Sequence, residues 1–176
     1  LQATYGRYLS KLAGFGAHKG TLLEVGAGNG FFLEEAQRLG YAEVRGVEPS
    51  KDAIARAPAN LQGRIVCDVM RPGLFPAAEF DVICLMQVFD HVPCPKELLG
   101  ECLRVLKPGG LILFLQHDVQ ALSARIMGEK SPIVDIEHTY LYTPKTLSRM
   151  LHMTGFEVLH AGSAWNTYSL QYLTRL

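Results

Sequence analysis

The sequence predicts an α/β fold with a doubly wound, mostly parallel sheet that closes with an antiparallel C-terminal hairpin. Short apolar runs alternate with helical patterns along most of the chain, and this alternation is typical of parallel strands with helices on both faces. The runs are apolar almost throughout, as expected of strands that are buried on two faces. Only residues 163–166 separate the last two runs, which leaves no room for a helix, so these runs are expected to pair antiparallel.

The predicted strands are apolar runs of strand length, each bounded by turn residues. In chain order they are residues 21–26, 43–49, 64–69, 80–86, 111–117, 156–162 and 167–173. The stretch 106–110, LKPGG, is predicted to be a turn that leads into the fifth strand.

Helical patterns lie between these runs, and their ends carry recognisable signals. Residues 31–39 have helical apolar spacing and stop before Gly40. Ser50 is suited to cap the helix that follows it. Pro95 marks the start of a helix within residues 94–106, and Thr143 is expected to cap another that ends at Gly155.

The composition favours one domain over the whole chain, residues 1–176, in the cytoplasm. The 176 residues are 48% hydrophobic, and 17 basic side chains balance 17 acidic ones. No polybasic segment indicates a nucleic-acid partner, and no apolar run is long enough to span a bilayer. The four cysteines lack CxxC spacing and are expected to be reduced thiols. The chain does not begin with Met, so we expect an N-terminal piece to precede Leu1.

Three glycines, Gly26, Gly28 and Gly30, follow the first predicted strand directly. A glycine-rich turn at this place brings the backbone close to a ligand at the carboxyl edge of the sheet. A dinucleotide-binding turn has the pattern GxGxxG, but its third glycine would fall on Phe31. A phosphate-binding P-loop needs a lysine after its glycines, and none follows here. The spacing therefore argues against both of these phosphate ligands.

Three carboxylates near the ends of successive predicted strands indicate a different ligand. Glu24, beside the glycines, suits an ammonium group, and the helix N-terminus beyond the glycines suits a carboxylate. Glu48 can accept hydrogen bonds from two ribose hydroxyls, and Asp68 can accept one from the adenine amine. Together these groups describe S-adenosylmethionine. Plain structural roles, a solvated strand end for Glu48 and a turn cap for Asp68, stay open.

With these residues the sequence resembles the class I S-adenosylmethionine-dependent methyltransferases, in the branch that acts on small molecules. The matching stretches are LLEVGAGNG, GVEPS, CDV, FDVICLMQVFDHV and LRVLKPGG, which keep the family's order. The resemblance implies a Rossmann-like sheet of seven strands and binding of S-adenosylmethionine, with S-adenosylhomocysteine as the product. The cofactor-binding residues that it implies are Tyr5, Glu24, Gly26, Ala27, Gly28, Gly30, Glu48, Pro49, Asp68, Val69, Gln87 and Val88.

The stretch DIEHTYLYTPKTL, which begins at Asp135, resembles a segment at the substrate mouth of bacterial small-molecule methyltransferases. Its His138 suits either a general base for the acceptor or an anchor for the loop, and His91 is the second candidate base. The acids and histidines lack metal-ligand spacing, so a metal-independent in-line displacement is predicted. Aromatic residues such as Tyr140 and Tyr142 indicate a small, partly apolar acceptor.

Two other functions stay open at this point. The domain could bind the cofactor as a non-catalytic sensor or pseudo-enzyme subunit, which turnover with a panel of acceptors would test. A nicotinamide-dependent oxidoreductase is disfavoured by Phe31 and Glu24 and would bind NADH. The sequence carries no signal for the identity of the acceptor or for the oligomeric state.

Overall fold

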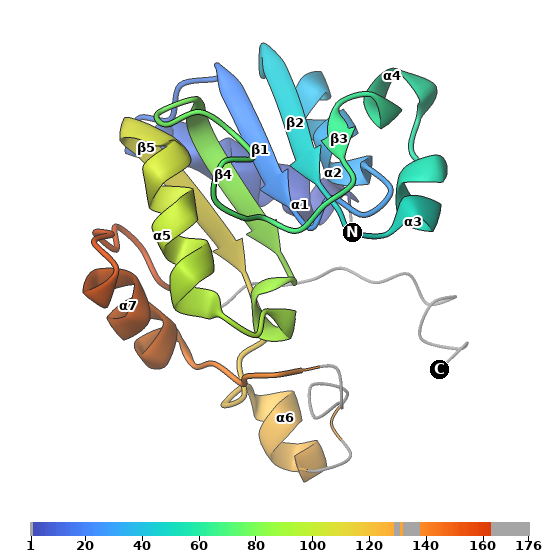
Figure 1. The fold of residues 1–176 in the computed structure, drawn as a ribbon. Coiled ribbons are helices and arrows are strands. Elements are labelled where there is room, and N and C mark those ends of the chain that lie inside the picture. Colours follow the sequence, from blue (N-terminus) through green and yellow to red (C-terminus); the bar gives the residue numbers. More distant parts are fainter. Residues whose placement is uncertain (1, 129–130, 132–137, 163–176) are drawn as a thin grey trace.

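The computed structural model describes residues 2–128, 131 and 138–162. Its centre is a sheet of five strands in the order β3-β2-β1-β4-β5 (Figure 1). All neighbouring strands pair in parallel, which confirms the predicted α/β class. The strands are β1 Thr21–Val25, β2 Glu43–Val47, β3 Ile65–Val66, β4 Phe80–Met86 and β5 Leu106–Leu115.

The predicted helix starts are confirmed by the capping contacts. The Ser50 side chain accepts a hydrogen bond from the Ala53 amide at 3.2 Å, and Thr143 and Thr146 form a reciprocal capping box. The helices are α1 Gln2–Lys11, α2 Phe31–Arg38, α3 Lys51–Ala55, α4 Ala59–Gln62, α5 Pro95–Val105, α6 Leu122–Met127 and α7 Pro144–Met153. Two 3-10 turns, η1 Leu12–Phe15 and η2 Phe89–His91, complete the described elements.

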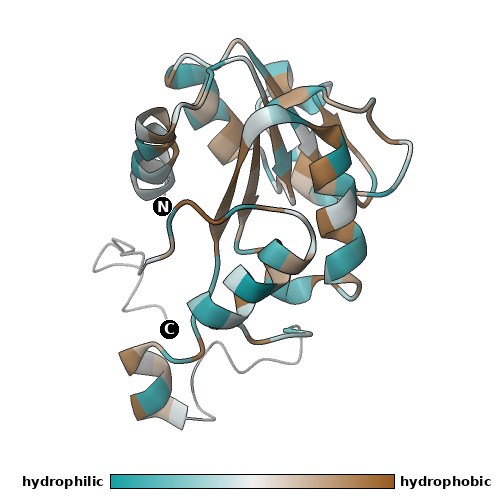
Figure 2. Cartoon of the chain, turned by 90° about the vertical axis from the view of Figure 1, so that its left-hand side faces the viewer, coloured by the Kyte–Doolittle hydropathy of each residue, from teal (hydrophilic) through white to brown (hydrophobic). Residues whose placement is uncertain are grey.

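The two faces of the sheet carry separate apolar cores, as expected when successive strand residues point to opposite sides. In β1, Leu22 belongs to a core that contains buried residues of α1 and α2, and Leu23 belongs to one that contains buried residues of α5 and α7. Figure 1 shows α5 and α7 together on one side of the sheet. Figure 2 shows hydrophobic colouring through the central strands and mixed colouring on the helices around them.

The strand order places β1 at the centre, between β2 and β4. The chain winds from β1 toward β3 on one side and then crosses to β4 and β5 on the other, so the winding direction reverses beside β1. In open α/β sheets, ligands bind at the carboxyl ends of the strands at this reversal. The turn after β1, which holds the glycines, therefore lies at the position where a ligand is expected.

The fifth strand begins earlier than predicted, because residues 106–110 continue the strand instead of forming a separate turn. Leu106 pairs with Phe80, and the register shifts before Val82 pairs with Leu111. Gly109 has a φ of +76°, and a Cβ at Gly110 would lie 3.0 Å from the Asp81 carbonyl oxygen. The two glycines thus allow an irregular strand start that residues with side chains would obstruct.

The prediction of seven strands is not confirmed beyond the parallel five. Residues 156–162 are not a strand in the structure, although Phe156 is buried in the core beside α5 and α7. A strand needs hydrogen bonds to a neighbour as well as an apolar pattern. The intended hairpin partner, residues 167–173, lies outside the described residues.

Two further properties of the described residues bear on function. None of their helices has the length and apolarity that crossing a membrane requires. They include all four cysteines, and none of these forms a disulfide.

Candidate functional site

The glycine turn joins β1 to α2 and is held against the end of β2. The amides of Gly26 and Ala27 both donate to the Val47 carbonyl oxygen, at 2.8 and 3.0 Å. All three glycines have positive φ, +77° at Gly26, +53° at Gly28 and +75° at Gly30. Residues with a side chain rarely adopt this backbone conformation, so the turn depends on glycine.

The three glycines differ in what surrounds them. A side chain at Gly26 would collide with Val88. A Cβ at Gly30 would lie 3.3 Å from the Ile65 side chain, so this glycine allows the start of α2 to pack closely against β3. At Gly28 no atom lies within 4 Å of the Cβ position, so the turn presents bare backbone to open space. Gly28 is therefore the position where a ligand can approach the main chain.

Glu24 is a buried carboxylate at the carboxyl end of β1. The residue is 2% exposed, and its Oε2 atom has no hydrogen-bond partner among the residues that the structure describes. Burial raises the pKa of Glu24 well above its usual range, and the charge of Glu48 raises it further. A buried polar atom without a partner is costly, which points to a ligand that supplies a hydrogen-bond donor here.

Glu48 follows β2 and reaches across to the glycine turn. Its Oε2 accepts from the Gly28 amide at 2.9 Å, and its Oε1 accepts from the Ser50 amide at 2.9 Å. Each carboxylate oxygen can accept more than one hydrogen bond, so both atoms keep acceptor capacity. The neighbouring Pro49 is exposed. This geometry fixes the carboxylate at the edge of the open space beside Gly28.

Asp68 follows β3 and has a partner that the sequence did not indicate. Arg71 donates to Asp68 Oδ2 at 2.9 Å, and the Val69 amide donates to Oδ1 at 2.8 Å. The Arg71 hydrogen bond is the main cause that lowers the pKa of Asp68. The Val69 side chain is 56% exposed. Residues 68–71 are not helical, so the helical spacing rule could not have identified this pair from the sequence.

Gln87, Tyr5 and Val88 come together beyond the end of β4. The Tyr5 hydroxyl donates to Gln87 Oε1 at 2.8 Å, which connects α1 to this position. Gln87 has a φ of +58°, an unfavourable conformation for a residue with a side chain. Its backbone amide donates to the Leu115 carbonyl oxygen at 2.7 Å. Strained residues of this kind occur often at functional sites. The structure therefore places Val88 against Gly26 of the glycine turn and Tyr5 against the neighbouring Gln87.

Three histidines surround the buried carboxylate of Asp90. His117 Nδ1 lies 2.8 Å from Asp90 Oδ2, and His138 Nε2 lies 3.4 Å from the same oxygen. His91 Nε2 lies 3.5 Å from Asp90 Oδ1. We call these four residues the histidine cluster. The cluster includes the sequence candidates His138 and His91, whereas Asp90 and His117 were not predicted.

Asp90 is held in its charged form by the cluster. Burial would raise the pKa of this carboxyl, but the hydrogen bond from His117 and the charges of His91 and His117 outweigh it and lower the pKa to about 2. The amides of Thr139 and Tyr140 also donate to the Asp90 carbonyl oxygen, at 2.8 and 3.2 Å. The loop before α7 is therefore anchored on η2, which agrees with the anchoring role considered for His138.

The cluster also has the residue types of a metal site. Asp90, His91 and His138 each offer a ligand atom, and these atoms lie within 4.8 Å of one another. Sequence spacing does not reveal this arrangement, because His138 comes from a segment far from the adjacent Asp90 and His91. Metal independence stays a prediction, and chelation is the direct way to test it.

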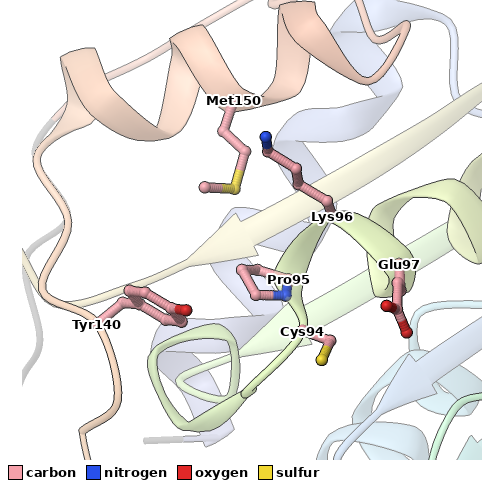
Figure 3. Close-up of a pocket in the computed structure, with 6 residues that line it drawn as sticks. All are labelled: Cys94, Pro95, Lys96, Glu97, Tyr140 and Met150. Atoms are coloured by element: carbon pink, nitrogen blue, oxygen red, sulfur yellow. The ribbon is translucent and has the colours of Figure 1, made fainter.

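A hollow of about 320 Å³ lies between the start of α5 and α7. Figure 3 shows its lining, which is Cys94, Pro95, Lys96, Glu97, Tyr140 and Met150. The glycine turn and Glu24 do not line this hollow, so it is separate from the site described above. The predicted acceptor residue Tyr142 is 5% exposed and packs on Phe89, so it belongs to the core.

Comparison with known proteins gives a consistent result. A family model described as a methyltransferase domain matches residues 1–161. A ubiquinone biosynthesis O-methyltransferase from Aliivibrio fischeri is 29% identical over 167 residues, which cover 85% of this chain and 71% of that protein. Three further relatives of this name, from other bacteria, are covered over less than half of their length.

Solved structures resemble the fold as well. An S-adenosylmethionine-dependent methyltransferase from Archaeoglobus fulgidus has a TM-score of 0.72 at 22% identity, over 99% of this chain and 84% of that one. A phosphoethanolamine N-methyltransferase from Haemonchus contortus, bound to S-adenosylhomocysteine, has a TM-score of 0.64 at 24% identity. The match covers 85% of this chain and 37% of that one. At these identities the likeness shows the fold. None of these comparisons supports the non-catalytic alternative.

Proposed function

The chain belongs to the S-adenosylmethionine-dependent methyltransferase family, and we propose that it methylates an oxygen of a small, partly apolar acceptor at the site beside the glycine turn. The cofactor supplies a methyl group on a positively charged sulfur, which a nucleophile displaces in line. The protein's task is then to hold both reactants in alignment, which can contribute on the order of 7–11 kcal/mol.

The buried Oε2 atom of Glu24, which has no hydrogen-bond partner among the described residues, is the observation that carries this proposal. Such an atom is costly in the folded protein by itself, but it suits an ammonium group. Gly28, with open space beside its backbone, supports the same conclusion, because a ligand can lie where a side chain would otherwise be. The residues present therefore fit the amino-acid end of the cofactor.

The remaining cofactor contacts are assigned by the groups that each residue offers. We assign the two ribose hydroxyls to Glu48, whose oxygens are already oriented by the Gly28 and Ser50 amides. Asp68 and Val69 are assigned to the adenine, and the Arg71 pair limits how Asp68 can turn. Tyr5, Gln87 and the adjoining Val88 would form the wall next to the transferred methyl group.

Two observations support a phenolic oxygen as the acceptor. The relatives named above are O-methyltransferases of ubiquinone biosynthesis. In addition, α6 lies beyond the carboxyl end of the sheet and carries exposed apolar side chains, Leu122, Ile126 and Met127 (Figure 1). A phenol has an aromatic body for such contacts and a hydroxyl that becomes nucleophilic once it loses its proton. The histidine cluster, with His138 and His91, supplies the groups that can accept this proton.

Calorimetric titration with S-adenosylmethionine, S-adenosylhomocysteine and NADH tests the cofactor site. We expect binding of the first two only, and loss of binding in Gly28→Val. Gly73→Val is the matched control, because Gly73 also has positive φ, +84°, and no atom within 4 Å of its Cβ position. Glu48→Ala should weaken binding by about 1.5–3 kcal/mol, as expected for lost charge-assisted hydrogen bonds.

The same titrations can contradict the proposal. Unchanged affinity in Gly28→Val would show that the cofactor binds elsewhere, and tight binding of NADH would favour an oxidoreductase. Formation of S-adenosylhomocysteine with catechol, compared with a simple amine and a thiol, then tests the preference for oxygen.

A further inference from the structure

His117 connects the histidine cluster to the wall of the cofactor site. One nitrogen of its ring, Nδ1, lies 2.8 Å from the buried Asp90 carboxylate. The other, Nε2, lies 3.4 Å from the amide nitrogen of Gln87, whose amide oxygen accepts from Tyr5. The His117 side chain is 33% exposed, so the ring can be reached from solvent. It is thus placed between a fixed charge and the reaction site.

These contacts determine which nitrogen carries the proton. An ionised carboxylate only accepts hydrogen bonds, so Nδ1 is the protonated nitrogen and donates to Asp90. The Tyr5 hydroxyl fixes the amide oxygen of Gln87, which leaves the amide N–H groups of Gln87 facing His117. In the neutral ring Nε2 therefore carries the lone pair, which faces the side-chain N–H groups of Gln87 in the wall of the cofactor site.

We propose that His117 is the general base of the reaction and that Asp90 is the positioning residue that holds its tautomer. This inference rests on the proposed function of the site. His117 Nε2 accepts the proton of the acceptor hydroxyl while the oxygen forms its bond to the methyl carbon, and the electron pair of the broken carbon–sulfur bond stays on sulfur. The imidazolium that forms is stabilised by Asp90 and returns its proton to solvent.

The geometry favours His117 over the two candidates found from the sequence. His91 and His138 both direct Nε2 toward Asp90, at 3.5 and 3.4 Å, so this nitrogen faces the carboxylate in each ring. His117, in contrast, turns one nitrogen to Asp90 and the other to Gln87. His91 and His138 then act by surrounding the carboxylate that holds His117.

Nitrogen NMR of histidine-labelled protein tests the tautomer without any acceptor. The spectrum of His117→Gln identifies the His117 signals by their absence. We expect neutral His117 to show a protonated Nδ1 and a bare Nε2, and Asp90→Asn to shift part of the population toward the opposite tautomer. A protonated Nε2 in the unmodified protein would overturn the proposal, whether or not the acceptor class is correct.

Kinetics with two phenols tests the role in proton transfer. Catechol keeps its proton at neutral pH, whereas 4-nitrocatechol is largely ionised and does not need a base. His117→Gln should lower kcat with catechol by about 100-fold or more, should affect 4-nitrocatechol much less, and should leave S-adenosylmethionine binding unchanged. His152→Gln, an exposed histidine in the last turn of α7, is the matched control.

Two kinetic outcomes would contradict the proposal. Equal losses with both phenols in His117→Gln would indicate a structural role, and a selective loss in His138→Gln or His91→Gln alone would assign the base to that residue. If neither phenol is methylated although S-adenosylmethionine binds, the acceptor class fails, and the NMR result still decides whether His117 presents its lone pair.

Discussion

Replacing Glu24 with glutamine removes one charge from the interior and keeps the size of the side chain. Glu24 is 2% exposed, and burial and the charge of Glu48 raise its pKa well above the usual range. An acid whose pKa is raised on folding destabilises the folded state increasingly as the pH rises above the pKa of the unfolded chain, about 4.3. Without cofactor, Glu24→Gln should therefore be more stable than the unmodified protein at neutral pH, and the difference should shrink toward pH 4.

The effect on cofactor binding should have the opposite sign. A hydrogen bond between charged groups contributes about 1.5–3 kcal/mol, so the loss of the Glu24 charge should weaken binding of S-adenosylmethionine by about 10- to 150-fold. The pairing requires the ionised form of Glu24, which the raised pKa disfavours. Binding at a pH below the raised pKa of Glu24 should therefore release a proton, and the affinity should rise as the pH increases through that pKa.

Calorimetry in two buffers of different ionisation enthalpy measures this proton release directly. The unmodified protein and the control Glu157→Gln, which changes an exposed carboxylate, should release a proton on binding, and Glu24→Gln should not. Equal affinity and equal proton release in Glu24→Gln would refute the assignment of Glu24 to the ammonium group. Thermal denaturation of the same variants without cofactor provides the stability comparison.

Three further predictions concern the glycine turn, the contacts of Asp81 and the need for a metal. Gly26→Ala should lower stability and weaken cofactor binding, because the new methyl group collides with Val88 at a φ of +77°; a normal melting temperature would contradict the packing argument. Asp81→Ala should lower the free energy of unfolding by about 1–3 kcal/mol, because the Thr21 amide and Lys107 lose their acceptor. The pKa of Asp81 is lowered by these contacts, so urea titrations should show this stabilisation above about pH 4 and its loss at lower pH. Treatment with EDTA should leave the methylation rate unchanged, and a rate restored only by added zinc would indicate that Asp90, His91 and His138 hold a metal.

Local sequence patterns determined most of the secondary structure and predicted the residues that we assign to the cofactor. Helix caps such as Ser50 and Thr143 act on amides within three residues, so a short stretch of sequence contains the whole interaction. The glycine turn and Glu24 are likewise close in the chain, and parallel strands bring their carboxyl ends to one edge. Glu48 could therefore be placed at the same edge as the glycine turn from the sequence, and the structure adds the hydrogen bond that it accepts from the Gly28 amide.

Only the tertiary structure decided how the acceptor side is arranged. Asp90, His117 and His138 come from three separate segments after β4, after β5 and before α7, and no spacing in the sequence relates them. The direction in which each ring nitrogen points depends on packing and hydrogen bonds between these segments. The irregular start of β5 has the same origin, because it depends on contacts between Gly110 and the neighbouring strand. The sequence by itself thus determined the fold class and the cofactor, whereas long-range contacts decided how the three histidines are arranged around Asp90.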